Sequence, residues 1–387
     1  MDKMKKLAII GASYLQNPLI EKANQRGMET HVFAYKDDAI GEKTAFCFYP
    51  ISIIEKDAIL EKCQEIGIDG ICTIASDLAV VTVNYVAEKM GLIGNSIETT
   101  MKSTNKHHMR QCFFENNDPS PKSYKVQSSK DLSEARLAFP MIVKPLDRSG
   151  SRGITKVYSF SELEDAICHA LDQGFEKSAL VEEFAEGDEY SIEYVSWQGI
   201  HHFLAITKKY TTGSPHFIET GHVEPALLSA EIEEKIKLTV SHALTGLGIR
   251  YGASHSEVKI TKDGTIKIIE IGGRMGGDFI GSSLVELSTG FDYLSAIIDI
   301  SLGIEPDVKV SPGTHAAVRF VINQNDINTL EMMKRDHPEI LVDYVINNAH
   351  TPKEVTDSSN RYGYFIFSSS DRSLIEKYLP DTEVEEK

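Results

Sequence analysis

A hairpin signal around residue 263 constrains this chain more than any other short stretch. The segment HSEVKITKDGTIKIIEIGG (255–273) places Asp263 and Gly264 between two β-rich runs. Because Asp-Gly tolerates the positive φ angles of a two-residue type I′ turn, the segment predicts two antiparallel strands. With Asp263 and Gly264 as the loop, Glu257 lies directly opposite Glu270 on one face of the hairpin.

Two carboxylates in that arrangement repel each other unless a cation lies between them. Mg²⁺ takes oxygen ligands and is held by one or two carboxylates together with substrate phosphates. Glu257 and Glu270 therefore predict a magnesium site, in which Mn²⁺ is also acceptable. The competing interpretations are a solvated face on which the two glutamates repel weakly, and a β-bulge that shifts the register.

The sequence after the hairpin favours an anion site beside that metal. Four glycines within 272–277 surround Arg274 and let the backbone approach a ligand closely. Arg274 can clamp an anion through two parallel hydrogen bonds. A metal beside an anion clamp is the layout for phosphoryl chemistry, so Arg274 and Glu270 are the predicted catalytic residues.

A second stretch, MIVKPLDRSGSRGITKV (141–157), predicts a phosphate loop. An apolar strand ends at Lys144, and a loop rich in glycine and serine follows. Backbone amides and hydroxyls of such a loop can surround phosphates, while Lys144 supplies a point charge. The dipeptide Gly-Lys occurs nowhere in the chain, so this is not a Walker A loop. The competing interpretation is an exposed mobile hairpin whose lysine reaches into solvent.

A third stretch, ALVEEFAEGDEYSIEYV (179–195), places acids at the junction of two predicted strands. Glu182 and Glu183 end one apolar strand, and Glu189 begins the next. Backbone groups and an acid suit the adenine edge of a purine nucleoside, and another acid suits its ribose hydroxyls. The competing interpretation is a solvated turn.

The first ninety residues predict a small open parallel sheet. Apolar strands alternate there with helical patterns, which is the βαβα rhythm of such a sheet. The expected strands are 7–10, 30–35 and 68–74, and the expected helices are 18–25 and 78–90. The turn GASYLQNPL after the first strand lacks G-x-G-x-x-G, so it is either a tight strand-to-helix connection or a turn that faces a ligand.

The rest of the chain predicts α+β organisation without internal repeats. Beyond a polar helix from about 101, we expect strands at 123–126, 141–144, 154–158, 179–184, 189–197 and 201–207, a long loop to Pro225, a helix over 231–247, and tail strands at 314–322 and 362–368. The expected domains are an N-terminal α/β domain (1–100), a core (101–310) with a central lobe at about 120–185 and a C-terminal lobe from about 186, and a C-terminal extension (311–387).

Composition excludes some function classes. A formal net charge of −17 argues against non-specific nucleic-acid binding, which needs Lys and Arg on phosphates. The five cysteines lack metal-type spacing and are expected to be reduced. The chain shows no signal-peptide pattern and no apolar run of about 18 residues, so we expect a cytoplasmic protein without membrane contact. A homodimer is the base-rate expectation.

The three stretches together resemble the ATP-grasp superfamily, in order and spacing over roughly residues 1–305. The resemblance implies an ATP-grasp fold of α/β and α+β class, with a Rossmann-like N-terminal lobe, a small central lobe and a C-terminal lobe that grips ATP with it. The chain is also similar to carbamoyl-phosphate-synthase-like and biotin-carboxylase-like members. The stretch FIETGHVEPA (217–226) resembles most the branch of L-amino-acid ligases and carnosine-synthase-like enzymes. In that stretch Glu219 and His222 either face the substrates or organise the loop.

The resemblance also implies a set of nucleotide-binding residues. Lys106 and Lys144 match the lysines expected on ATP phosphates. One of Lys208 and Lys209 is expected there as well, and we take Lys208. The set is completed by Ser149, Gly150, Ser151 and Gly153 of the loop over the triphosphate, by Glu182, Glu183, Phe184 and Ala185 of the hinge along adenine, and by Glu189 on the ribose.

At the metal, Glu257 and Glu270 match the Mg²⁺ ligands, and Arg274 matches the arginine that steadies the transferred phosphoryl group. The family commonly reads E-x-N-x-R there, with the Asn as a third metal ligand. This chain has Gly272 instead. A second metal ion is therefore open, as is a water or another side chain in place of that ligand.

By this resemblance the chain is an ATP-dependent carboxylate–amine ligase that forms an amide or peptide bond through an acyl phosphate and releases ADP and phosphate. Its expected cofactors are ATP and Mg²⁺, and amino acids are the expected substrates. The absence of a nucleophile motif agrees, because this chemistry needs charge neutralisation and alignment. The alternatives are an ATP-grasp enzyme of bicarbonate, carbamoyl or purine-pathway type, and a non-catalytic ATP-binding regulator. An NAD-dependent dehydrogenase is disfavoured by the missing fingerprint.

Overall fold

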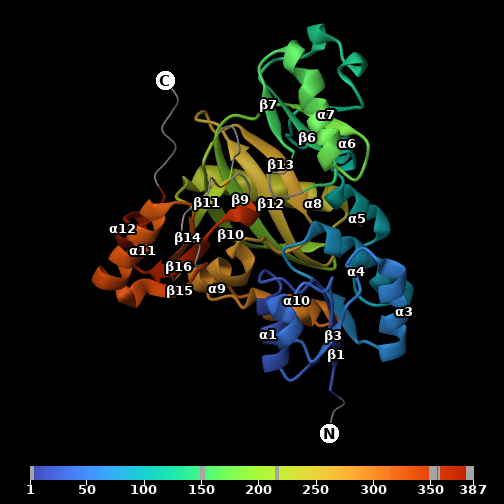
Figure 1. The fold of residues 1–387 in the computed structure, drawn as a ribbon, viewed down its shortest axis with the longest axis vertical. Helices are drawn as coiled ribbons and strands as arrows, with labels where there is room; N and C mark the ends of the chain where they lie inside the picture. Colours follow the sequence, from blue (N-terminus) through green and yellow to red (C-terminus); the bar gives the residue numbers. More distant parts are fainter. Residues whose placement is uncertain are drawn as a thin grey trace.

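The structure is a computed structural model that describes residues 4–148, 153–213, 218–311, 313–347, 355 and 358–380. Its strands form a four-stranded parallel sheet, a four-stranded antiparallel sheet and an eight-stranded antiparallel sheet. Figure 1 shows the parallel sheet with its helices at one end of the large sheet and the small sheet at the other. The predicted combination of an α/β lobe with two antiparallel lobes is confirmed.

The N-terminal lobe is a parallel sheet between helices. Its strands are β1 (Lys6–Ile10), β2 (Glu29–Phe33), β3 (Cys47–Tyr49) and β4 (Gly70–Cys72), in the order β3-β2-β1-β4, and its helices are α1 (Asn17–Gln25), α2 (Ile40–Thr44), α3 (Lys56–Ile66) and α4 (Asp77–Met90). Leu7 to Ile10 are fully buried, as expected for a strand covered on both faces. Strand β3 was not predicted, because three residues carry no periodic signal.

The turn after β1 is closed by one of its own side chains. Gln16 accepts a hydrogen bond from the Ser13 amide (3.2 Å) and donates one to the Ile74 carbonyl (2.9 Å). A Cβ on Gly11 would lie 3.0 Å from the Gln16 side chain. The side-chain amide thus occupies the space in front of the turn. The connection is therefore tight, which further disfavours a dinucleotide site. The same turn also faces a cavity, because Gly11, Ser13 and Gln16 are among the residues that line it.

Two helices lead from the parallel sheet to the central lobe. Asn105 separates α5 (Ile97–Thr104) from α6 (Lys106–Glu115), and its side chain accepts hydrogen bonds from the backbone of His107 and His108. The single polar helix expected here is therefore two helices. The central lobe consists of β5 (Ser123–Val126), β6 (Met141–Pro145), β7 (Thr155–Val157), α7 (Leu163–Gln173) and β8 (Ala179–Glu183), with the strand order β5-β8-β6-β7.

The C-terminal lobe is built on the large sheet. It comprises β9 (Asp188–Trp197), β10 (Ile200–Thr211), β11 (Glu219–Glu224), α8 (Ala230–Leu247), β12 (Gly252–Ile260), β13 (Ile266–Gly272), α9 (Val285–Thr289), α10 (Tyr293–Ser301), β14 (His315–Val321), α11 (Gln324–Asp336), β15 (Leu341–Ile346), β16 (Gly363–Ser369) and α12 (Arg372–Glu376). The strand order is β13-β12-β9-β10-β11-β14-β16-β15. Strand β11 contradicts the long loop expected before Pro225: it pairs with both β10 and β14, although its sequence is mostly polar.

The predicted hairpin exists, but its loop differs from the prediction. Thr261 pairs with Thr265 around a three-residue loop in which Gly264 has a φ of 77°. That register alone would place Glu257 opposite Ile269. A β-bulge at Ile269 shifts the pairing by one residue, and Glu257 is again the partner of Glu270. The predicted pair is thus confirmed, while the predicted two-residue loop was wrong.

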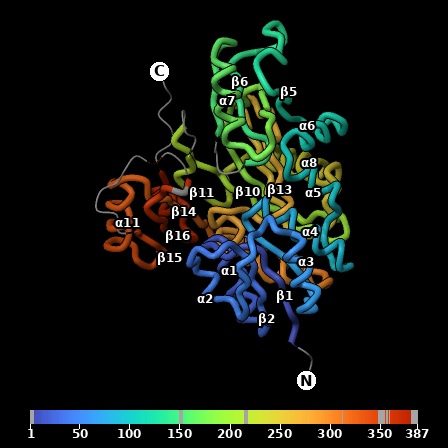
Figure 2. The backbone as a smooth tube through the Cα atoms, turned by 45° about the vertical axis from the view of Figure 1, so that its right-hand side comes forward, coloured from blue at the N-terminus to red at the C-terminus, as the bar shows by residue number. Residues whose placement is uncertain are grey.

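The last strands form the edge of the large sheet opposite the hairpin. Strand β14 pairs with β11, and β16 lies between β14 and β15. Figure 2 shows β14, β16 and α11 on the side of the molecule opposite α3 to α6, next to the N-terminal lobe. Residues far apart in the sequence therefore come together where this end of the sheet meets α1. Within the described residues, no helix is long and apolar enough to cross a bilayer.

A carboxyl group is buried without a charged partner at the end of β11. Glu224 is fully buried and accepts hydrogen bonds from the hydroxyls of Thr207 and Ser288, both at 2.6 Å. Burial raises the pKa of the Glu224 carboxyl to about 7, although the two hydroxyls oppose the shift. The folded protein therefore binds a proton here that the unfolded chain releases at lower pH.

We predict that this group makes the protein less stable as pH rises from about 4.5 to about 7, because the native state binds the extra proton in that window. The free energy of unfolding of Glu224→Gln minus that of the parent protein should be about 1–3 kcal/mol larger at pH 8 than at pH 5, because only the parent loses stability over this range. Urea unfolding at both pH values measures the difference. Glu65→Gln, at an exposed glutamate, is the control. An equal effect of Glu224→Gln at both pH values would contradict the prediction.

Candidate active site

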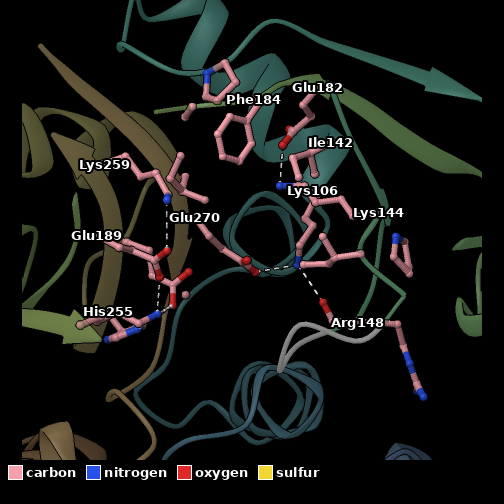
Figure 3. Close-up of a pocket in the computed structure, with 18 of the residues that line it drawn as sticks. Lys106, Ile142, Lys144, Arg148, Glu182, Phe184, Glu189, His255, Lys259 and Glu270 are labelled. Atoms are coloured by element: carbon pink, nitrogen blue, oxygen red, sulfur yellow. Dashed lines mark hydrogen bonds and ion pairs between the residues drawn. The ribbon is translucent and has the colours of Figure 1, made fainter. Parts of the chain in front are cut away.

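A cleft lies between the central lobe and the large sheet. Figure 3 shows its two facing walls, with Ile142, Lys144 and Arg148 on one side and Glu189, His255 and Lys259 on the other. The residues that line it are Asp77, Lys106, Pro121, Ile142, Lys144, Pro145, Arg148, Ile154, Glu182, Glu183, Phe184, Ala185, Glu189, Lys209, Glu219, His255, Glu257, Lys259, Ile269, Glu270, Gly272 and Arg274. Most of the residues predicted from the sequence are thus brought together in one cleft.

The apolar end of the cleft is at the connection from β8 to β9. Phe184 follows β8 directly, and its amide donates a hydrogen bond to the Pro140 carbonyl (3.2 Å). The ammonium groups of Lys156 and Lys259 lie 3.8 and 5.8 Å from the centre of the Phe184 ring. A flat ring, with the apolar side chains of Ile142 and Ala185 also lining the cleft, suits an aromatic base.

The carboxylate of Glu182 is engaged in ion pairs and is not available to a ligand at this end of the cleft. Its carboxylate is buried between Arg110 (2.7 Å) and Lys144 (2.5 Å). Burial opposes ionisation, but the two cations outweigh it and hold the pKa of Glu182 below its usual range. Glu182 therefore fixes Lys144 at the end of its strand. Arg110 was missed from the sequence because it lies in the middle of a helix without motif context.

The phosphate-type end of the cleft begins at Lys106. This lysine is the first residue of α6, and its ammonium donates to Glu270 (2.8 Å) and to the Arg148 carbonyl (2.9 Å) (Figure 3). Ser149, Gly150 and Ser151 lie outside the described residues. Gly153 is not among the residues that line the cleft. A Cβ there would lie 2.9 Å from both Pro145 and Gln173, and its φ of 71° also favours glycine.

A second lysine holds the other predicted metal ligand. The Lys209 ammonium lies 2.6 Å from Glu189, 2.7 Å from Glu257 and 3.7 Å from Glu219. Burial disfavours the charged amine, but the three carboxylates outweigh it and hold the pKa of Lys209 well above its usual value. A permanently charged lysine therefore occupies the centre of an acidic cluster.

This position corrects the choice of Lys208. The Lys208 side chain pairs instead with Asp188 (3.3 Å) and does not line the cleft. The reason is a β-bulge at Leu204: before it, Phe203 pairs with Tyr194, and after it the pairing between β9 and β10 is shifted by one residue. Without the bulge, Lys208 would lie opposite Glu189. With it, Lys209 faces the cleft.

A buried histidine also touches the predicted metal pair. His255 Nε2 lies 3.5 Å from Glu257, and Nδ1 contacts the fully buried Glu193. Burial opposes protonation, but Glu193 outweighs it and raises the pKa of His255 to about 9. The imidazole is therefore a second positive group beside Glu257. Sequence reasoning missed this pair, although His255 and Glu257 alternate on β12 and so share a face.

Arg274 is held by an acid from the N-terminal lobe. Asp77, the first residue of α4, accepts two hydrogen bonds from its guanidinium, at 2.9 Å (Nε) and 3.0 Å (Nη2). The backbone amide of Ala75 also donates to the Met275 carbonyl (3.2 Å). A Cβ on Gly272 would lie 2.9 Å from the Asp77 carboxylate. Gly272 therefore leaves room for Asp77. The remaining terminal nitrogen of Arg274, Nη1, donates only a long hydrogen bond to the Met275 carbonyl (3.4 Å), which an anion could replace.

The residues present fit a magnesium ion. Glu257 and Glu270 are cross-strand partners and both line the cleft, where lysines now neutralise them. Within the described part of the chain, no group of three or more His, Cys, Asp or Glu side chains is arranged to hold a metal alone. Two carboxylates whose remaining coordination positions are left to phosphate and water match the preference of Mg²⁺.

A second cavity adjoins this cleft. It lies between the N-terminal lobe and the large sheet and shares Asp77, Lys209, Glu257 and Arg274 with the cleft. Glu219 and His255 also line both. The remaining residues of the second cavity include Ser13, Tyr35 and Ser76 of the N-terminal lobe, and His222, Asp278 and Ile280 of the C-terminal lobe. Two adjoining cavities that meet at an arginine and several carboxylates can hold two reactants against each other.

Comparisons with known proteins agree with this geometry. A model of the ATP-grasp domain matches residues 137–282. The structure superimposes on that of the L-amino acid ligase from Bacillus licheniformis with a TM-score of 0.84 and 24% identity, over 98% of this chain and 96% of the other. The chain therefore carries an ATP-grasp domain in an ATP-grasp fold, as the sequence resemblance indicated.

Curated relatives point to the same branch of ligases. The chain is 27% identical to alanine–anticapsin ligase of Bacillus subtilis over 63% of its own length and 56% of the relative's. It is 23% identical to human carnosine synthase 1 over 80% of its own length and 41% of the relative's. The match spans little more than half of the first relative and less than half of the second.

The contact between Gly272 and Asp77 predicts non-additive mutations. Gly272→Ala should lower the free energy of unfolding by about 1–2 kcal/mol, because the new methyl group pushes Asp77 away from Arg274. In an Asp77→Ala background the same change should cost less, since only the milder approach to the Arg274 guanidinium (3.3 Å) remains. Chemical denaturation of the four proteins of the cycle measures both effects. An equal cost of Gly272→Ala in the two backgrounds would refute the proposed contact.

Proposed function

Starting from a chain that carries an ATP-grasp domain, we propose an ATP-dependent carboxylate–amine ligase that joins amino acids or similar small molecules. The observation that carries the proposal is the cross-strand pair Glu257 and Glu270 in the cleft, with Lys106 and Lys209 beside it. Glu257, Lys209 and Arg274 also line the second cavity and so mark the junction of the two. One cavity suits a nucleotide and the other a small polar substrate. The resemblance of the chain to L-amino-acid ligases supports this division.

In the proposed complex the adenine lies against Phe184 and Ala185, where backbone edges face the cleft. Glu189, next to Lys259, binds the ribose hydroxyls (Figure 3). The phosphates extend from there toward Lys144 and Lys106. Both lysines are buried and positioned by carboxylates, so they present a charge at a fixed place. That pre-organisation is what stabilises a triphosphate as its charge moves.

Glu257 and Glu270 would hold Mg²⁺ in this scheme, and the ion would supply charge neutralisation between the outer phosphates. Lys106 and Lys209 now pair with these carboxylates. When a cation takes their place, both ammonium groups become free to turn toward phosphate oxygens. The lysines thus keep the acidic pair stable in the empty cleft and bind nucleotide in the filled one.

The proposed reaction has two steps. A substrate carboxylate oxygen attacks the γ-phosphorus of ATP, the bond to the bridging oxygen breaks, and an acyl phosphate and ADP form. An amine then attacks the acyl carbon, loses a proton and expels phosphate, which leaves an amide. In this scheme the guanidinium of Arg274, which Asp77 holds in place, exchanges the long hydrogen bond from its Nη1 to the Met275 carbonyl (3.4 Å) for the phosphoryl oxygens.

The proposal is tested by a phosphate-release screen with ATP and Mg²⁺ over amino acids, singly and in pairs. We expect one class of amino acid to stimulate release, and a second compound to stimulate it further. Mass spectrometry should then find a product that equals the two substrates minus one water. Tight ATP binding without any stimulated release would favour a regulator, and stimulation by bicarbonate would favour the carboxylating branch of the fold.

Glu270→Gln should lower stimulated phosphate release by about a hundredfold or more, because the variant loses half of the protein's carboxylate charge at the metal. Thermal unfolding should show a folded variant with a lower midpoint, because Lys106 keeps its hydrogen bond to the Arg148 carbonyl but loses its charged partner. Glu65→Gln, an exposed change on α3, should leave release unchanged. Substantial turnover by Glu270→Gln would eliminate the metal assignment.

A further inference from the structure

The wall of the second cavity contains a strained loop that the proposed reaction does not explain. Asp278 and Phe279 are consecutive residues with φ angles of 49° and 67°. Neither is glycine, so each adopts a left-handed conformation at an energetic cost. Such strain persists only where surrounding contacts hold it, and it concentrates at functional sites. Asp278 is also one of the residues that line the second cavity.

The contacts that hold this loop come from the C-terminal segment. The guanidinium of Arg361 donates to Asp278 at 2.8 Å, and its centre lies 3.8 Å from the centre of the Phe320 ring. The ring of Tyr364 lies 4.1 Å from that of Phe279. An ion pair and a ring contact therefore fix both strained residues. Figure 2 shows the segment that supplies them beside the N-terminal lobe, where the cavity lies.

The same arginine holds a second acid of the cavity wall. Arg361 donates to Glu219 at 3.0 Å and keeps it next to Asp278. Arg361 is 5% exposed, so it is shielded from the cavity while the two acids line it. Glu219 also lies 3.7 Å from Lys209, but that lysine has closer partners in Glu189 and Glu257. One guanidinium between two carboxylates leaves an excess of negative charge on the wall.

The third group of the wall adds no positive charge. His222 is 1% exposed, its Nε2 lies 4.0 Å from Asp278, and its Nδ1 has no hydrogen-bond partner among the described residues. Burial lowers the pKa of His222 to about 3, so the imidazole stays neutral. An unpartnered buried nitrogen is costly unless a ligand satisfies it. The wall of the second cavity therefore presents the Asp278 carboxylate and the neutral His222 imidazole to a ligand.

We propose that Asp278 is a specificity-determining residue that binds a positively charged nitrogen group of the substrate in the second cavity, and that Arg361 is its positioning residue. The inference rests on the proposed ligase function. Asp278 is four positions after Arg274 in the chain, so their backbones are at most about 14 Å apart. A small substrate can therefore present its carboxylate to Arg274 and its cationic nitrogen to Asp278.

Asp278→Asn tests the charge alone. Asparagine has the same shape and adopts the left-handed conformation readily, so the loop should be retained. The assay compares phosphate release with lysine, ornithine and arginine, with neutral amino acids, and with carboxylic acids that lack the α-amino group. Relative to the parent, kcat/KM for the substrates with the recognised cation should fall about tenfold or more, while KM for ATP changes less than about twofold.

The panel also distinguishes the two sources of the cation. If the α-ammonium binds Asp278, all amino acids lose efficiency together and the des-amino acids do not. If the side chain binds it, only lysine, ornithine and arginine lose efficiency. Either pattern supports the proposal. Unchanged discrimination between charged and uncharged substrates in Asp278→Asn would overturn it.

Arg361→Lys tests the positioning role. A lysine keeps the charge but cannot bridge Asp278 and Glu219 in the same way. KM for the cationic substrate should rise about tenfold while KM for ATP is retained. Arg372→Lys is the matched control, because Arg372 pairs with Glu376 on α12 outside both cavities. Equal effects of the two arginine variants would overturn the role of Arg361.

A binding measurement keeps this inference separate from the ligase proposal. If no pair of amino acids supports phosphate release by the parent protein, the ligase proposal fails. Thermal shift with ADP, Mg²⁺ and L-lysine or n-butylamine then reports on the cavity alone. A shift with these probes that Asp278→Asn loses would support the cation site. No shift beyond that given by 4-methylpentanoate, which lacks a cationic nitrogen, would overturn it.

Discussion

The site depends on the pairing of two glutamates across one hairpin. Glu257 and Glu270 bring like charges together on one face of a sheet, which is unfavourable unless cations lie nearby. The fold supplies them from separate elements: Lys106 from α6, Lys209 from β10 and the charged His255 from β12. Each of these cations is itself buried and depends on the acids. The charges of the cluster therefore depend on one another. Through Lys106 the cluster also joins α6 to the large sheet, which carries the hairpin.

Two β-bulges decide which side chains enter this cluster. One, at Ile269, turns Glu270 toward Glu257, and the other, at Leu204, turns Lys209 toward the cleft. Because neighbouring residues of a strand face opposite sides, a shift of one residue exchanges them completely. The bulges explain why Lys208 was the wrong choice. The bulge at Ile269 also explains why the predicted glutamate pair was right although the predicted loop was wrong. The real loop is one residue longer than predicted, and the bulge shifts the pairing back by one residue.

The fold was largely predictable because its lobes have strong apolar rhythms, whereas the site was predictable only where residues follow a motif. The three stretches around Lys144, Glu182 and Glu270 gave most of the cleft. Strand β11 was missed because its side chains serve the cavity, so its sequence is polar and reads as a loop. Asp77 and Arg361 were missed because their partners lie 197 and 83 residues away in the sequence, and no local pattern announces such pairs.

The contact of Asp77 with Arg274 has a consequence for recombination between relatives. A side chain at position 272 and an acid at position 77 compete for the same space, yet they belong to different lobes. In a chimera, a hairpin with a side chain at position 272 would push Asp77 away from Arg274, and an N-terminal lobe without the acid would leave Arg274 without this partner. The two lobes are therefore not freely interchangeable.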